Sequence, residues 1–412
     1  MTPYIVFIIL VTIIVADFIL ETYLEILNLK NLSGILPKEL KDLYDAEKYA
    51  KSQSYERANI HFGLVSSCFN LILILGMFFL GGFAWIDHLA AGITAHPVLH
   101  PLVFFGILGL ALDLLNTPFA VYDIFVIEQR FGFNKTTPKL FITDKLKGWL
   151  LSAIVGGGLL ALVIWFYQQT TVYFWLWAWA LMSAFMLFMV FFYSSLIVPL
   201  FNKQKALEDG ELKSQITNYA DRAGFHIDKI YTIDGSKRST KANAYFSGMG
   251  RKKRIVLFDT LINELSTNEI VAVLMHEIGH YQKKHIVSSM VLSFIQTGIM
   301  LFIFSLFVSQ PILSQALGMT DASFHIGLIA FGILFSPISV IIGLAMNTLS
   351  RKNEYQADSF AANYGMSNDL IGALKKLSVN NLSNLTPHPL YVFFHYSHPT
   401  LLQRIRNLQG IN

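Results

Sequence analysis

Seven long, nearly uncharged stretches restrict the folds that this chain can adopt. As a helix rising 1.5 Å per residue, each is long enough to cross about 30 Å of hydrocarbon. The first stretch has no basic segment before it and no small-residue cleavage site after it, so it is read as a membrane span rather than a signal peptide. With 54% hydrophobic and 14% charged residues, the composition is that of an integral membrane protein. The predicted spans are 3–24, 60–85, 101–126, 149–168, 172–197, 286–309 and 325–349.

The positive charges all fall on one side of this pattern. The 31 lysines and arginines lie between spans one and two, three and four, and five and six, and after span seven. The positive-inside rule therefore predicts an N-terminus outside the membrane and a cytosolic active site and C-terminus. The net charge of +4 is modest, and no basic stretch is interleaved with aromatic residues. The expected surroundings are a lipid bilayer, and nucleic acid is not expected as a partner.

The spans and the polar segments divide the chain into four parts. We expect five spans with two cytosolic loops, then a cytosolic cap, then two more spans, and finally a cytosolic tail. These parts are 1–197, 198–285, 286–349 and 350–412.

The polar segment between spans five and six predicts a small domain of its own. Residues 206–223 are typical of a helix, and Ile230–Ile233 and Arg254–Phe258 are typical of short strands. The predicted fold class is thus an all-α integral membrane protein of seven transmembrane helices, with a small cytosolic cap of mixed α/β structure.

A histidine pair with metal-ligand spacing lies at the end of this cap. Ser266 and Glu269 form a capping box, and the apolar run that follows predicts a helix through His276-Glu277-Ile278-Gly279-His280. Positions i and i+4 share one helix face, so His276 and His280 can both bind one Zn²⁺. Glu277 beside them can take a proton from a water molecule that zinc activates, which is the chemistry of peptide hydrolysis.

A catalytic zinc ion needs a third protein ligand and an open fourth position. Glu354 is the best candidate, because it opens the segment Glu354-Tyr355-Gln356-Ala357-Asp358 just after the last span. Asp358 lies on the same helix face and can accept the N–H of a ligating histidine. Taken alone, two acids at this spacing more often form a solvated helix face. They indicate a metal site only in combination with the histidine motif.

Five motifs strongly resemble the type I CAAX prenyl proteases, the family of the yeast a-factor converting enzyme. The resemblance runs nearly from end to end and includes the seven spans. The motifs are Glu128-Gln129-Arg130-Phe131-Gly132-Phe133-Asn134-Lys135, Lys241-Ala242-Asn243-Ala244-Tyr245-Phe246, His276-Glu277-Ile278-Gly279-His280, Glu354-Tyr355-Gln356-Ala357-Asp358 and His395-Tyr396-Ser397-His398-Pro399.

The resemblance implies a barrel of seven helices around a large water-filled chamber, with a zinc site that faces inward near one end. Without it, His398 would be read as a surface histidine and Asn243 as a turn residue. The roles that the resemblance implies are zinc binding by His276, His280 and Glu354, general base for Glu277, orientation of a histidine by Asp358, support of the site by Arg404, oxyanion stabilisation by His398, and substrate binding as an added strand by Asn243 and Ala244.

The expected substrate is a peptide that ends in a CaaX motif, prenylated or not. The chain ends at Gly410-Ile411-Asn412 without a long tail or a retrieval signal, which favours a bacterial inner membrane over the endoplasmic reticulum. In a bacterium the substrate would be another membrane-threaded segment. The sequence predicts neither the natural substrate nor the oligomeric state.

Two other functions compete with this interpretation. A heat-shock membrane quality-control metalloprotease would share the HExxH motif but usually has fewer spans. A transporter would explain the polar residues Asp113, Asn116 and Asp123 near one face of span three. A transporter has no reason to carry the zinc motifs, and paired half-helices broken by Gly or Pro are absent from this sequence.

Overall fold

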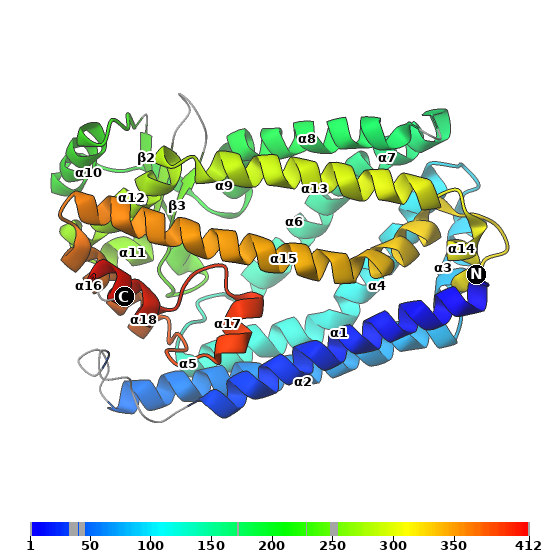
Figure 1. Cartoon of the computed structure of the whole chain (residues 1–412), viewed down its shortest axis with the longest axis horizontal. Helices are drawn as coiled ribbons and strands as arrows, with labels where there is room; N and C mark the ends of the chain where they lie inside the picture. The colour runs from blue at the N-terminus through cyan, green and yellow to red at the C-terminus, as the bar shows by residue number, and fades with distance from the viewer. Residues whose placement is uncertain are drawn as a thin grey trace.

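The computed structural model describes residues 2–32, 40, 46–170, 173–227, 229–247 and 254–410. Long helices run side by side along the molecule, with the small sheet and several short helices gathered at one end (Figure 1). The N-terminus lies at the opposite end, near α3 (Gly82–Ile93) and α14 (Pro311–Ala316).

The predicted number of membrane spans is confirmed. Within the described residues, seven helices are long and apolar enough to cross a membrane. Three of them contain a π-helical turn, at Asp123–Glu128, Ser152–Gly156 and Tyr193–Ile197. The seven are Pro3–Asn31 (α1), Ala46–Phe79 (α2), Leu99–Phe131 (α4 to α5), Pro138–Thr170 (α6 to α7), Phe174–Phe201 (α8 to α9), His285–Phe307 (α13) and Phe324–Asn363 (α15).

The second span ends earlier than the predicted 60–85. Helix α2 stops at Phe79, and Gly81 adopts a left-handed conformation with a φ of 68°. Glycine takes that conformation without the steric cost that a Cβ would bring. The chain therefore turns there, and the apolar residues that follow form the separate helix α3, which packs against α4 (Leu99–Tyr122).

Two membrane helices continue far beyond their apolar cores. Helix α2 begins at Ala46, inside the segment that the sequence predicts as a polar loop, and α15 continues past residue 349 to Asn363. The expected division between the last span and the tail thus falls inside one helix. This continuity matters for the site, because the same helix carries Glu354 and Asp358 out of the membrane region.

A four-stranded sheet forms the centre of the cap. Its order is β1-β2-β4-β3, with β2 and β4 parallel and the outer strands antiparallel to their neighbours. Both predicted strands are present, but they pair in parallel, and β3 lies between them in the sequence. β3 is an edge strand of this sheet. The strands are β1 (Gln204–Ala206), β2 (Lys229–Ile233), β3 (Ala244–Ser247) and β4 (Arg254–Phe258).

Short helices complete the cap and the tail. The predicted helix 206–223 is observed as α10, which starts five residues later, after Gly210. Sheet residues such as Ile255 and Leu257 share a buried core with Ile278 of α12 and Ala361 of α15. The remaining helices are α10 (Glu211–Arg222), α11 (Asp259–Glu264), α12 (Thr267–Gln282), α16 (Ser367–Asn380), α17 (Pro389–His395) and α18 (Leu401–Leu408).

The predicted capping box at the start of α12 is confirmed and gives a pH-dependent contribution to stability. The Ser266 amide donates to Glu269 Oε2 at 2.8 Å, and Lys376 Nζ lies 2.7 Å from the same oxygen. Burial raises the pKa of Glu269, but these contacts outweigh burial and lower it below its usual range. The charged form of Glu269 is therefore the stabilising form.

Glu269→Gln is expected to lower stability by about 0.5–1 kcal/mol at pH 7, because the amide keeps the capping geometry but loses the charge pair. The folded-state pKa lies below the unfolded one, so the carboxylate contributes fully above the unfolded value of about 4.3 and progressively less below it. Thermal unfolding in detergent from pH 7 to pH 2.5 should show a constant difference above about pH 4.3 and the two proteins converging below it. A constant difference across the whole of that range would contradict the charge-based explanation.

Candidate active site

The candidate site lies where α12 packs against α15. A Cβ on Gly279 would come within 3.1 Å of Ala357 Cα and 3.2 Å of Ala357 O, which is tighter than nine in ten Cβ contacts in proteins. A glycine at this place in the HEIGH motif therefore permits the close approach of the two helices. That approach brings His276 and His280 of α12 opposite Glu354 of α15.

The three predicted metal ligands converge on one point. The Nε2 atoms of His276 and His280 are 3.2 Å apart, and each lies 3.2–3.3 Å from a carboxylate oxygen of Glu354. One atom from each residue lies within 4.8 Å of the other two. Glu354 Oε2 is buried, and its nearest partners are His276 Nε2 at 3.3 Å and Arg404 Nη1 at 3.6 Å, so a cation at this point would meet a carboxylate oxygen that is only weakly satisfied. Two imidazole nitrogens and a carboxylate fit a divalent transition metal ion.

Asp358 and Arg404 form a second layer behind His276. Asp358 Oδ1 lies 2.9 Å from His276 Nδ1, and Arg404 Nε donates to Asp358 Oδ2 at 3.0 Å. Because a carboxylate only accepts, Nδ1 of His276 must carry the proton, and its Nε2 presents a lone pair toward the other ligands. Both residues thus lie where their predicted roles require.

The contacts of His276 with the two carboxylates also change the pKa of its imidazole. Burial lowers the pKa of the imidazole, but the hydrogen bonds to Asp358 and Glu354 outweigh burial and raise the pKa to about 9. The two carboxylates therefore make this buried location favourable for positive charge. A metal ion bound there must displace the proton that the histidine would otherwise hold at neutral pH.

His285 and Gln356 support the second ligating histidine, and the sequence analysis missed both. His285 Nδ1 lies 3.0 Å from His280 Nδ1, and His285 Nε2 lies 2.9 Å from Gln356 Oε1. Since Gln356 Oε1 accepts, His285 donates through Nε2 and accepts through Nδ1. His280 then donates through Nδ1 and keeps Nε2 free for a metal. The sequence gives only a weak signal for the role of His285. Its position relative to His280 depends on the left-handed conformation of Lys284, which a sequence pattern does not predict.

His285→Leu is expected to lower the affinity of the site for zinc by about 10–100-fold, because it removes the acceptor that fixes the tautomer of His280. Zinc affinity can be measured by competition with a chelator of known affinity. His226→Leu is the matched control, since the His226 side chain is 92% exposed and lies outside the site. Equal affinities in the two variants would show that the His285 contact does not orient His280.

A cavity of about 600 Å³ adjoins His280, one of the three candidate ligands. Glu277 and His280 line it on one side, and Tyr245 of β3 and Asn353 of α15 also reach it. Glu277 is half-buried and next to His276 in sequence, so its carboxylate can face molecules in the cavity. The remaining wall is largely apolar and comes from α8 (Phe174–Phe192) and α13, through Phe185, Met186, Met189, Val190, Ile286 and Met290.

The tail returns to the site and places His398 beside Glu354. His398 Nε2 lies 3.2 Å from Glu354 Oε1, and Ser397 Oγ lies 2.9 Å from His398 Nδ1. The His398 side chain is 62% exposed, in contrast to the buried ligands. It is therefore close to the metal-ligating atoms and still accessible from solvent, as a group that contacts a substrate must be.

Asn243 and Ala244 lie at the start of the edge strand β3. The carbonyl of Asn243 accepts from the amide of Phe258, and its side chain accepts from the amide of Ala244 at 2.8 Å. Asn243 is exposed. Tyr245 and Phe246 of the same strand line the cavity beside Glu277. An added strand would pair with the outer edge of β3, next to the ligands.

Comparisons with known proteins show the family to which the chain belongs. Residues 25–203 match the model of the CAAX prenyl protease N-terminal region with five membrane helices, and residues 206–412 match the model of peptidase family M48. The chain belongs to peptidase family M48. CAAX prenyl protease 1 of Saccharomyces cerevisiae is 36% identical over 97% of this chain and 94% of its own length.

Other members of the family show the same extent of similarity. The homolog from Arabidopsis thaliana is 36% identical over 95% of both chains, and the Homo sapiens homolog is 31% identical over 91% of this chain and 88% of its own. The crystal structure of S. mikatae Ste24p matches with a TM-score of 0.92 and 38% identity, over 98% of each chain. The predicted fold, a seven-helix membrane barrel with a metallopeptidase cap, is confirmed.

The match to CAAX prenyl proteases over nearly the whole chain separates the competing functions. The chain is a membrane metallopeptidase of the CAAX prenyl protease family, and the heat-shock and transporter alternatives gain no support. The polar residues of span three that suggested a transporter contact neighbouring helices, with Asp113 2.8 Å from Lys145 and Asn116 bonded to Asn70. The relatives named above are eukaryotic, and nothing supports the expected bacterial inner membrane.

Proposed function

We propose that this chain is a zinc endopeptidase that cleaves near the C-terminus of CaaX-type peptides, prenylated or not. The observation that carries the proposal is the convergence of His276, His280 and Glu354, with His280 and the neighbouring Glu277 at the wall of a cavity of about 600 Å³. Two histidines and one carboxylate with an open position are the protein ligands of many zinc peptidases.

Zinc is the metal that we assign to His276, His280 and Glu354. Bound there, it would lower the pKa of a coordinated water and polarise the scissile carbonyl. Asp358 fixes the tautomer of His276, and His285 fixes that of His280, so that each ligand presents its Nε2 to the metal. Arg404 donates to both carboxylate oxygens of Asp358 and so holds it in place.

The chain's own residues supply the remaining chemistry. Glu277 accepts a proton from the attacking water and passes it to the amine that leaves. His398 donates a hydrogen bond to the oxygen that becomes negative as the carbonyl is attacked, a position consistent with its exposure beside Glu354. Proton transfer of this kind contributes about 10²–10⁴-fold to a rate.

The substrate segment is proposed to bind as an added strand on β3. Asn243 and Ala244 would hold its backbone, and the strand direction would carry the peptide past Glu277. The apolar wall formed by α8 and α13 offers a surface for a hydrophobic group on the peptide, such as a prenyl chain. With the positive charges on the cytosolic side, the cap would accept substrates from the cytosol.

The test is zinc content together with cleavage of a farnesylated CaaX peptide, for the wild-type protein and Glu277→Ala in the same detergent. We expect both proteins to hold zinc and only the wild type to cleave. Glu277 lies beside the ligands without being one of them, so its loss should remove the base and leave the metal.

The other outcomes separate the parts of the proposal. Cleavage of an unprenylated CaaX peptide but not of the farnesylated one would support the peptidase chemistry but contradict the proposal that the apolar wall accepts a prenyl chain. Full activity in Glu277→Ala would remove Glu277 from the mechanism. Absence of zinc from a wild-type protein prepared without chelators would contradict the metal assignment.

A further inference from the structure

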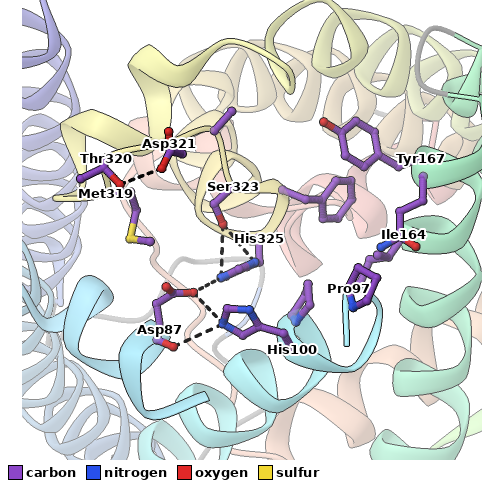
Figure 2. Close-up of a pocket in the computed structure, with 14 residues that line it drawn as sticks. Asp87, Pro97, His100, Ile164, Tyr167, Met319, Thr320, Asp321, Ser323 and His325 are labelled. Atoms are coloured by element: carbon purple, nitrogen blue, oxygen red, sulfur yellow. Dashed lines mark hydrogen bonds and ion pairs between the residues drawn. The ribbon is translucent and has the colours of Figure 1, made fainter. Parts of the chain in front are cut away.

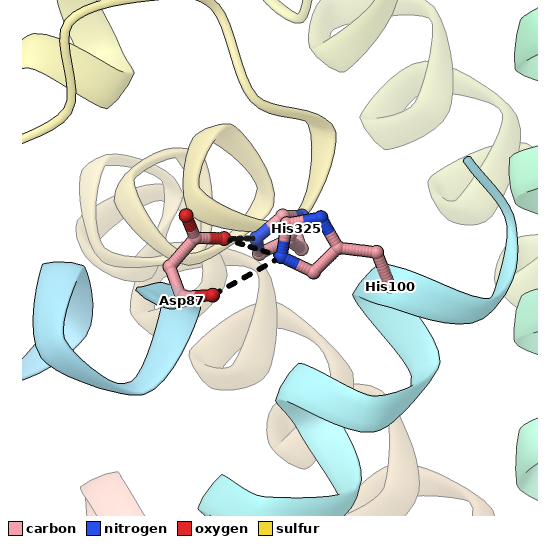
Figure 3. A group of neighbouring side chains, drawn as sticks. All are labelled: Asp87, His100 and His325. Atoms are coloured by element: carbon pink, nitrogen blue, oxygen red, sulfur yellow. Dashed lines mark hydrogen bonds and ion pairs between the residues drawn. The ribbon is translucent and has the colours of Figure 1, made fainter. Parts of the chain in front are cut away.

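A second cluster of histidines and a carboxylate lies at the end of the barrel opposite the active site. It consists of Asp87 on α3, His100 on α4 and His325 on α15 (Figure 3). His325 and Glu354 both lie on α15, 29 positions apart, which corresponds to about 44 Å along a helix. The two clusters are therefore separate sites. In the orientation proposed above, this one faces the non-cytosolic side.

The three residues present ligand atoms to one another at close range. His325 Nε2 lies 2.6 Å and His100 Nε2 lies 2.9 Å from Asp87 Oδ1. One atom from each residue lies within 4.8 Å of the other two, as in the catalytic cluster. Asp87 and His325 are buried, and His100 is half-buried. Both histidines thus turn the same nitrogen toward the same carboxylate.

The surroundings of the cluster resemble those of a metal site. Ser323 Oγ lies 3.1 Å from His325 Nδ1 and 3.3 Å from its Nε2, so the hydroxyl can accept from Nδ1 while Nε2 faces Asp87 (Figure 2). The cluster opens onto a cavity of about 320 Å³, which would give an ion a way in and leave a coordination position for water. Asp321 also lines that cavity and adds a negative charge to its wall.

We propose that Asp87, His100 and His325 form a second site for a divalent transition metal ion. Two imidazoles and one carboxylate favour zinc over magnesium or calcium, which prefer oxygen ligands. The ligands come from three helices that are far apart in the sequence, so a bound ion would join α3 and α4 to α15. The bound ion would stabilise the packing of these helices at the end of the barrel opposite the active site, and catalysis does not require it.

The test is the number of zinc ions per chain in the purified full-length protein after dialysis against a weak chelator. We expect about two ions in the wild type, and about one in either His100→Leu or His280→Ala. The double variant should hold none. His88→Leu is the control, because His88 is exposed beside Asp87 and outside the cluster, and it should retain two.

Cleavage and stability provide the second readout. His100→Leu should keep peptide cleavage within about two-fold of the wild type. When the active site already holds zinc, further zinc should raise the melting temperature of the dialysed wild type but not that of His100→Leu. One ion per wild-type chain, all of it lost in His280→Ala, would overturn the proposal and leave the cluster as a hydrogen-bonded contact. Because this outcome is read from the wild type and an active-site variant, it does not depend on the folding of His100→Leu.

Discussion

Glu354→Ala is expected to lower cleavage by about 10³-fold or more and to reduce zinc at the catalytic site to background. Glu354 supplies the only carboxylate among the three converging ligands, and His398 lies 3.2 Å from it. Without this residue, two histidines alone must hold the ion. A metal supplies several kcal/mol of transition-state stabilisation, and each 1.4 kcal/mol corresponds to a factor of ten.

The measurement is zinc stoichiometry beside cleavage of the same peptide, with Glu277→Ala as the matched control. Both variants should be inactive, but only Glu354→Ala should lose the metal. The proposed second site at Asp87 would still hold its own zinc ion in Glu354→Ala. The zinc content per chain is therefore best measured in proteins that also carry His100→Leu. Normal zinc content in Glu354→Ala, even with lost activity, would show that another residue is the third ligand.

Arg404→Met is expected to destabilise the folded protein by about 3–5 kcal/mol, because it leaves buried carboxylates without their cationic partner. Asp358 is fully buried and Glu354 nearly so, and the guanidinium lies 3.0 Å from Asp358 and 3.6 Å from Glu354. The same change should weaken zinc binding by about 10–100-fold, since Asp358 would no longer be held against His276.

Thermal unfolding in detergent, with and without added zinc, measures both effects. The double variant Arg404→Met, Asp358→Asn should recover part of the lost stability, because it removes the unpaired charge together with its partner. Zinc should protect the single variant less than the wild type. Strictly additive losses in the double variant would show that the two residues do not interact.

The catalytic motif could be predicted from the sequence because its parts are local. The capping box at Ser266 and the spacing of His276 and His280 depend on helix geometry over one or two turns, and both are confirmed as structure. The number of spans could be predicted for a similar reason, since the length of an apolar run alone decides whether a helix can cross a bilayer.

Other features depended on contacts that no local pattern encodes. The end of α2 was misplaced because the turn at Gly81 interrupts a sequence that remains apolar. His285 was missed because its contact with His280 depends on the direction of α13 after the turn. The cluster at Asp87 was missed because its histidines are separated by more than 200 residues.

Apolar length and helical spacing are properties of short segments, so the amino-acid sequence is enough to predict seven membrane spans and a helix that carries two histidines on one face. Which carboxylate meets that helix depends on packing, because the close approach at Gly279 brings α15 and Glu354 to it. The tertiary structure also decided that the tail returns His398 to the same place. Groups distant in the chain come together only when packing places them there, and that placement depends on the whole fold.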